Sequence, residues 1–302
     1  MTPSTGRPRL LLVLTLLLTL LSPGPARAGQ VAVLTDSRVA QYRTALTAAK
    51  AVLPTSQVLE VSAPDLAQQL AQATAAGTVL LAIGQKAMAQ AHQSGAIVVF
   101  CMVLGPAAVS AKTVTGLRLE VSADVQLDFF RRVNPSIRRL GVLYNPQSWG
   151  EYVKAASRSA SARGLTLVTK PLSDARELRS EVNELAGSID ALWLIPDPQL
   201  ITVELFNFLL IFTLERRIAL FGFFEDFTRA GALASVAPDY AAIGRQAAKL
   251  AADLAAKPVE SRLPLPPSIA SPGTLTINAK TAQQFGIDIP DDVQAQASQV
   301  YR

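Results

Sequence analysis

The sequence predicts an α/β protein made of two Rossmann-like lobes, each with a parallel sheet, and a cleft between them. Short β-branched runs alternate with helical segments from Val31 to the end, which is typical of βαβ units and of parallel sheets covered on both faces. The chain has 302 residues, which is long for one hydrophobic core and comfortable for two. The second half repeats the rhythm of the first, and this favours two similar lobes.

Each strand is expected where an apolar, β-branched run is bounded by helical segments. In the first half, we expect strands at residues 31–35, 57–61, 78–83 and 96–103, and helices at 38–52, 64–75 and 85–93. In the second half, we expect strands at 139–145, 165–170, 190–196, 218–222 and 232–237, and helices at 148–163, 174–186, 201–216 and 239–256.

The N-terminal segment has the pattern of a secretory signal peptide. Arg7 and Arg9 precede an apolar run over residues 10–21, and Ala-Arg-Ala at 26–28 offers small residues at the usual cleavage spacing. A membrane anchor is the alternative, but a run of twelve residues at about 1.5 Å each does not cross a hydrocarbon core of about 30 Å. No cysteine follows the run, so we do not expect a lipoprotein. We expect residues 1–28 to be removed and the protein to be periplasmic or otherwise extracytoplasmic, and soluble there.

The charge and the single cysteine exclude two classes of function. Lys and Arg number 28 and Asp and Glu 23; removing residues 1–28 would leave 25 basic and 23 acidic residues, a net charge of +2. No Lys/Arg cluster with interleaved aromatic residues occurs, so a nucleic-acid partner is not expected. Cys101, within AIVVFCMVL, has no partner for an internal disulfide and is expected to be an inert core thiol.

Several separated sequence blocks occur in a fixed order along the chain. They are TVLLAIGQKAMAQA near Thr78, RRLGVLYNP near Arg138, SIDALWLIPD, RRIALFG and RAGALASVAPDYAAIGRQAAKLA over residues 188–250, and LTINAKTAQQFGIDIP near Leu275. With these blocks the chain resembles the extracytoplasmic solute-binding proteins of ABC importers, periplasmic binding protein type I-like, and most closely the branch of tryptophan- and tyrosine-type binding proteins. The resemblance implies a ligand carrier that closes about a hinge on a small molecule and is recognised by an ABC permease in the inner membrane.

The resemblance also implies that the chain passes between the lobes three times. We place these crossings near Leu119–Ser122, Ala237–Asp239 and Leu263–Leu265. The first lobe then takes residues 29–120 and about 238–263, and the second lobe takes 121–237 and about 264–302. The proline-rich stretch 258–273 either carries the last return or is simply a surface loop, because prolines fit both.

Candidate ligand-binding residues follow from the sheet architecture. In such sheets, ligands bind beyond the carboxyl ends of the strands, where helix N-termini present free N–H groups that suit a carboxylate. The residues at these positions are Asp36, Ser37, Gln85, Asn145, Ser148, Trp149, Asp197, Phe224 and Glu225. Asp36, Ser37 and Ser148 are equally expected as helix caps alone.

Two of these candidates have a more specific interpretation. Asp197, in IPDP, stands where the family has a strand-ending acid, so the resemblance implies that it pairs with the ammonium group of an amino-acid ligand; a turn aspartate is the alternative. Trp149 and the phenylalanines of ALFGFFEDF (219–227) are expected either to form an apolar wall for the ligand or to belong to the core. The apolar helix at 201–216 is expected in the core, with self-association as the alternative.

One departure from the family pattern bears on the ligand. Leu104 and Gly105 stand where many relatives have a hydroxylated segment ending in Asp-Pro, so one polar anchor is missing. This weakens the case for a standard α-amino acid and widens the range of expected ligands. The expected ligand is an amino acid or another small molecule, aromatic or carboxylate-bearing.

Signatures of catalysis are missing from the sequence. No G-x-S-x-G elbow, Walker A loop or G-x-G-x-x-G fingerprint occurs, and the lone His92 is expected as a surface or capping residue near a helix end. We therefore expect a monomer that is not an enzyme and holds neither a cofactor nor a metal. A binding module of the same shape that senses a ligand or acts as a scaffold is the alternative function.

Overall fold

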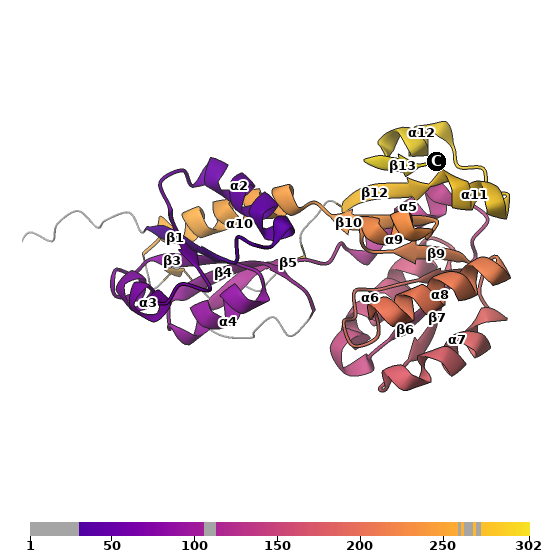
Figure 1. Cartoon of the computed structure of the whole chain (residues 1–302), viewed down its shortest axis with the longest axis horizontal. Coiled ribbons are helices and arrows are strands. Elements are labelled where there is room, and N and C mark those ends of the chain that lie inside the picture. Colours follow the sequence, from indigo (N-terminus) through magenta and orange to yellow (C-terminus); the bar gives the residue numbers. More distant parts are fainter. Residues whose placement is uncertain (1–29, 106–112, 259–260, 263–267, 270–272) are drawn as a thin grey trace, which may run out of the picture.

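The computed structural model describes residues 30–105, 113–258, 261–262, 268–269 and 273–302 (Figure 1). These residues form two α/β lobes around two separate sheets, so the predicted fold class is confirmed. The predicted signal peptide, residues 1–28, lies outside the described residues. Within the described ranges, no helix combines the length and apolar character needed to cross a membrane.

The first lobe is built on a sheet of six parallel strands. Their order across the sheet is β11 (Ser268–Ile269), β5 (Val114–Arg118), β4 (Ile97–Val103), β3 (Val79–Ile83), β1 (Val31–Thr35) and β2 (Gln57–Glu60). One face packs against α2 (Ala40–Val52) and α10 (Tyr240–Ala255), and the other against α3 (Leu66–Ala75) and α4 (Gln85–Gln93). Every residue of β3 is buried: Leu81 and Ile83 join the core under α2 and α10, and Leu80 and Ala82 join the core under α3 and α4. A sheet covered on both faces explains why this strand is uniformly apolar.

The second lobe has seven strands and its own two cores. Their order is β13 (Gln299–Tyr301), β12 (Gly273–Asn278), β10 (Ala234–Pro238), β9 (Ala219–Gly222), β8 (Ala191–Trp193), β6 (Arg139–Tyr144) and β7 (Thr166–Pro171). One face carries α5 (Ala123–Val133), α6 (Pro146–Ala162), α11 (Ala279–Phe285) and α12 (Asp291–Gln296). The other face carries α7 (Leu178–Ala186), preceded by the 3-10 turn η2 (Ala175–Glu177), and α8 (Val203–Arg216). The short helix α9 (Glu225–Ala230) follows β9.

The second sheet departs from the parallel pattern at one pair of strands. β10 and β12 are antiparallel, and Pro238 pairs with Gly273 at the end of their ladder. The chain leaves this lobe through β10 and returns through β12, so the two strands run side by side in opposite directions.

The third crossing lies later in the chain than the sequence predicted. Residues 263–265 lie outside the described residues, but β11 pairs with β5 and therefore still belongs to the first sheet. The passage into the second lobe falls between Ile269 and Gly273, so a start of the last part of that lobe at about residue 264 is too early.

The other two passages between the sheets end at capped helices. After β5, the Ser122 hydroxyl accepts a hydrogen bond from the Val125 amide at the start of α5; after β10, the Asp239 carboxylate accepts one from the Ala242 amide at the start of α10. A side-chain oxygen at this position satisfies an amide that the helix leaves free. The caps thus fix the residue at which each passage ends and the next helix begins.

Several predicted features differ in detail from the structure. The strand predicted at 190–196 is only Ala191–Trp193, because the chain then enters a loop with Pro196 and Pro198. In α8, Phe206, Leu209 and Phe212 are buried as predicted for a core helix, although Ile211 is 58% exposed. Cys101 is fully buried in β4, and burial raises the pKa of its thiol to about 12, as expected of an inert core thiol.

Candidate ligand-binding cleft

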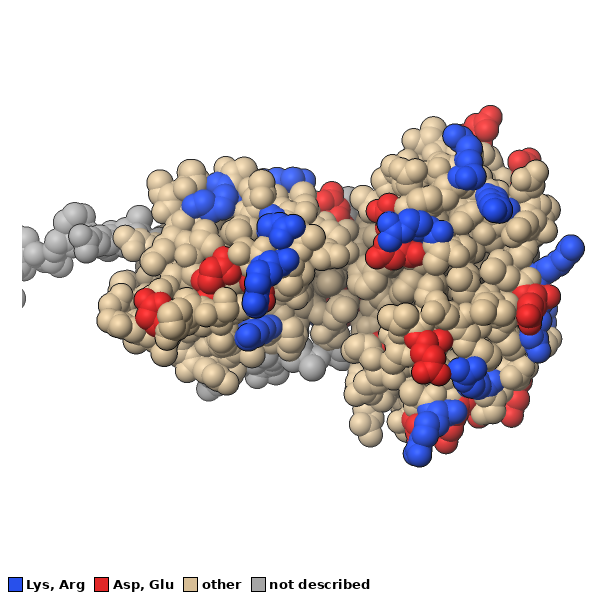
Figure 2. All heavy atoms as spheres, viewed as in Figure 1, with Lys and Arg blue, Asp and Glu red and all other residues tan. Residues whose placement is uncertain are grey.

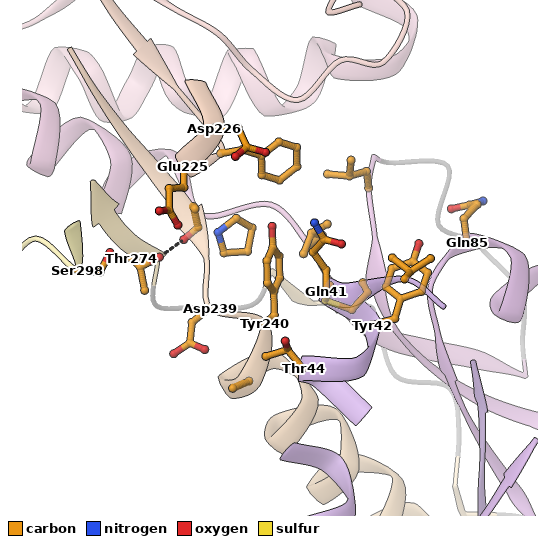
Figure 3. Close-up of a pocket in the computed structure, with 18 of the residues that line it drawn as sticks. Gln41, Tyr42, Thr44, Gln85, Glu225, Asp226, Asp239, Tyr240, Thr274 and Ser298 are labelled. Atoms are coloured by element: carbon orange, nitrogen blue, oxygen red, sulfur yellow. Dashed lines mark hydrogen bonds between the residues drawn. The ribbon is translucent and has the colours of Figure 1, made fainter. Parts of the chain in front are cut away.

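A cavity of about 870 Å³ lies between the two lobes and is lined by residues of both. Figure 3 shows Gln41, Tyr42 and Gln85 reaching it from the first lobe and Glu225 and Asp226 facing them from the second. In the space-filling view, the molecule narrows where the lobes meet, and basic and acidic side chains are interspersed over the visible face (Figure 2). A cavity of this volume is the size of an ordinary small-molecule site.

The first-lobe wall is set by two unusual backbone positions. Gly84, with a φ of +98°, precedes α4, and a Cβ there would lie 2.5 Å from the Tyr42 ring. Only glycine therefore lets the ring lie against this turn. Met102, in the irregular part of β4, has a φ of +59°, which is rare for a residue with a side chain. Its buried side chain also lines the cavity, and strained positions of this kind concentrate at functional sites.

The second-lobe wall comes from the loop after β9 and from the start of α9. Phe224 lies at the cavity with Glu225 and Asp226. Glu225 accepts a hydrogen bond of 2.6 Å from the Tyr301 hydroxyl, and Asp226 forms an ion pair with Arg229 one turn along α9. Both carboxylates are thus held at the mouth of the cavity by partners within their own lobe.

Tyr240, the first residue of α10, stands between the two walls at the second crossing. Burial and, to a smaller extent, the charges of Asp226 and Glu225 together raise the pKa of its hydroxyl to about 12. The two carboxylates therefore make this part of the cavity electrically negative.

A second cavity of about 430 Å³ adjoins the first and shares Leu104 and Pro198 with it. Ser148, Trp149 and Asp197 lie along it. Trp149 is only 2% exposed and packs edge to face on Tyr152, with ring centroids 5.4 Å apart, so most of its surface belongs to the core.

Asp197 is buried, and its carboxylate is already used by the protein. One oxygen accepts a hydrogen bond from the backbone N–H of Asn145 at 2.9 Å, and the other accepts one from the backbone N–H of Gln199 at 3.1 Å. The Asn145 side chain accepts a hydrogen bond from the Gln147 amide and donates one to Gln199. These bonds tie the loop after β8 to the start of α6, so Asp197 shapes this wall of the second cavity.

The structure brings some of the predicted site residues together and leaves others apart. Gln85, Phe224 and Glu225 line the main cavity, and Ser148, Trp149 and Asp197 line the second. Asn145 does not line either cavity; it caps α6 and donates a hydrogen bond to Gln199, which lines the second. Asp36 is paired with Arg38, and the Ser37 amide donates to Glu60; neither residue lines either cavity.

Several residues at the main cavity were not among the predicted ones. They are Gln41, Tyr42, Asp239 and Tyr240. Tyr42 and Gln41 lie within the first turn of α2 and not at a strand end, so the rule that selected strand ends passes over them. Tyr240 directly follows the predicted crossing at Ala237–Asp239, and this position next to a crossing could have identified it as a residue of the cleft.

Glu120 is a buried carboxylate beneath the cleft. It is 2% exposed; one oxygen accepts a hydrogen bond from the Gly105 amide at 2.7 Å, and the other has no partner among the described residues. Burial raises its pKa, while the Gly105 amide and the charge of Arg118 act in the opposite direction.

Replacing Glu120 with glutamine should flatten the dependence of stability on pH. Because the pKa of Glu120 is higher in the folded than in the unfolded state, folding favours its protonated form. In the unfolded chain the pKa of Glu120 is about 4.3. As the pH rises from this value to the raised pKa of the folded state, the free energy of unfolding of the natural protein should fall relative to that of Glu120→Gln. Denaturant titrations between pH 4.5 and 8 measure this difference. Parallel curves for the two proteins would contradict it.

The comparisons with known proteins agree with this architecture. The model of the family described as ABC transporter substrate binding protein matches residues 36–301, and this chain belongs to that family. It is therefore a substrate-binding protein of the ABC transporter type, which is a class of solute-binding proteins and not of enzymes. Within the described residues, no group of three or more His, Cys, Asp or Glu side chains is placed to hold a metal ion.

Individual relatives and structures are similar at lower identity. A tyrosine-binding protein of Clostridioides difficile (strain R20291) is 27% identical over 143 residues, which cover 47% of this chain and only 41% of that protein. The structure of the ABC domain in complex with L-Trp from Streptococcus pneumonia has a TM-score of 0.62 at 20% identity, covering 90% of this chain and 99% of that one. The ligand-free, open structure of a substrate-binding protein with adhesive properties from Clostridium difficile has a TM-score of 0.69 at 17% identity, with the same coverage. At these identities the structural matches establish the fold.

Proposed function

We propose that this protein captures a small molecule in the cavity between its lobes and presents it to an ABC permease for uptake. The observation that carries the proposal is that the main cavity takes its walls from both lobes, with Tyr42 on one side and Glu225 on the other. A ligand that contacts both walls binds better when the lobes are close together, and it therefore shifts the population towards the closed form. The crossings at Arg118–Ala123 and Pro238–Tyr240 are the hinges about which the lobes rotate in this proposal.

The proposed location is outside the inner membrane, and the proposed working unit is a monomer. The basic residues and apolar run at the N-terminus support export, because they have the pattern of a signal peptide. The similar proteins described above, a tyrosine-binding protein and a domain with bound L-Trp, support a ligand of amino-acid size.

Ligand capture predicts that one compound both stabilises and compacts the protein. A library of amino acids, amines, aromatic acids, nucleosides, sugars and short peptides is screened by thermal shift, and a hit at about 100 times its dissociation constant should add about 2.7 kcal/mol of stability. Small-angle X-ray scattering of the protein with that hit should show a smaller radius of gyration, because closure brings the lobes together. A ligand that stabilises without compaction contradicts hinge closure, and a library without hits contradicts ligand capture.

A further inference from the structure

The charged residues at the main cavity are all of one sign. Glu225, Asp226 and Asp239 line it, and none of its described lining residues is Lys, Arg or His. The carboxylate of an amino-acid ligand would enter this cavity without a cationic side chain to pair with, and beside two carboxylates that repel it. A positively charged group would instead be attracted by these carboxylates.

The charge of these carboxylates is only partly neutralised within the protein. Asp226 pairs with Arg229, but the side chains are 72% and 65% exposed, and such pairs bind weakly in water. The partner of Glu225 among the described residues is the neutral hydroxyl of Tyr301. Asp239 caps α10 and points away from Tyr240 in Figure 3, so the negative charge available to a ligand comes from Glu225 and Asp226.

Glu120 provides an independent observation beneath the same cleft. Its unpartnered oxygen belongs to a side chain that is 2% exposed and lines a small cavity. That small cavity shares Leu104, Leu119, Phe224 and Pro238 with the main one. Arg118 lies nearby, but the described residues form no ion pair between it and Glu120. A buried acceptor of this kind is satisfied by a donor or by a cation.

Aromatic faces complete the chemistry of the site. Tyr42 and Tyr240 approach the cavity from the first lobe, and Phe224 from the second. Ring faces attract cations within about 6 Å of their centroids and also pack against apolar bodies. Carboxylates and aromatic rings together therefore select a molecule with a positive charge and an apolar frame.

We propose that the cavity binds an organic cation: its charged nitrogen lies at Glu225 and Asp226, and its apolar or aromatic body lies against Tyr42, Tyr240 and Phe224. This inference rests on the proposed function and specifies the ligand class. The sequence led us to expect an amino acid or another small molecule, aromatic or carboxylate-bearing, and this inference departs from that expectation in giving the ligand no carboxylate.

Three probes that share one ring test the inference by charge alone. Tryptamine carries only the ammonium group, tryptophan carries ammonium and carboxylate, and indole-3-propionate carries only the carboxylate. Isothermal titration at pH 7 should give tryptamine a dissociation constant about tenfold or more below that of tryptophan, and the acid should not bind. Tyramine, tyrosine and 4-hydroxyphenylpropionate form a second matched set for a site that prefers a phenol.

The outcomes separate this inference from the proposed function. Tryptophan, tyrosine or either acid binding as tightly as its amine would overturn the cation inference, while closure on that ligand in X-ray scattering would still support capture. Failure of both amines to bind would also overturn the inference. Ligand capture itself is then tested by the thermal-shift screen of the wider library: a hit supports it, and the absence of any hit contradicts it.

Substitutions of the two carboxylates test where the charged nitrogen of the ligand lies. Glu225→Gln keeps an oxygen for the Tyr301 hydroxyl and so preserves the fold, but it should weaken amine binding about tenfold. Asp226→Asn should act in the same direction. Asp292→Asn, which removes an exposed acid of α12 paired with Arg132 of α5, is the control and should leave the affinity unchanged. Equal affinity in Glu225→Gln, Asp226→Asn and the natural protein would overturn the proposed position of the cation.

Discussion

Replacing Gly244 with alanine should lower the free energy of unfolding by about 3 kcal/mol, the upper part of the range for overpacked positions. Gly244 lies within α10 where this helix crosses α2, and a Cβ there would lie 2.2 Å from the Ala45 carbonyl oxygen. Since the obstructing atom belongs to the backbone, the two helices must move apart, and the core between them and the sheet loosens. Denaturant unfolding followed by circular dichroism measures the loss.

The same substitution at Gly150 is the matched control. Gly150 also lies inside a helix, α6, but its Cβ would meet no atom within 4 Å. Gly150→Ala should raise the free energy of unfolding by up to about 1 kcal/mol, because alanine is the better helix former. If both alanines stabilise the protein, the close approach of α2 and α10 is not as described.

Asp197→Asn should lower the free energy of unfolding by about 2–3 kcal/mol, as expected for loss of a charged, buried hydrogen-bond acceptor. Both oxygens of Asp197 accept backbone amides, from Asn145 and Gln199. Asparagine has one oxygen and one NH₂ group, so a donor will face one of these amides in either orientation. Urea unfolding at pH 7 measures the effect.

Asp253→Asn supplies the comparison, because it makes the same chemical change at an exposed position of α10, and its effect should stay within about 0.5 kcal/mol. The measurement also distinguishes the two roles considered for Asp197. A variant that keeps its stability but loses ligand affinity would show that Asp197 pairs with the ligand, as the family resemblance implied. A destabilised variant that binds normally would show that it holds the loop.

Strands with uniform apolar sequence could be predicted closely, whereas the short β5, which mixes apolar and polar residues around a glycine, could not. The prediction for 31–35 coincides with β1, and that for 78–83 contains β3, because both strands are covered on two faces. β5 was not predicted: its sequence VTGLR contains Gly116, which usually indicates a turn. The structure gives the reason for that glycine, since a Cβ would lie 2.2 Å from the Phe100 carbonyl oxygen on the adjacent strand.

The site was predictable only as far as it follows from strand ends. Glu225 and Gln85 begin helices directly after buried strands, and both reach the main cavity. Tyr42 and Tyr240 come from helices nearly two hundred residues apart in sequence, and both line the cavity because α2 packs against α10. No local pattern encodes that contact.

The contact at Gly244 also determines how the cleft can choose among ligands. With the backbones of α2 and α10 so close together, the proposed closure would carry these two helices, and with them Tyr42 and Tyr240, as one body. Under the proposed function, a ligand would meet the fixed spacing of these two rings before the lobes close, and this spacing would limit its size. In the proposed closed form, the residues of α9 would add their contacts last and so slow the release of a bound cation.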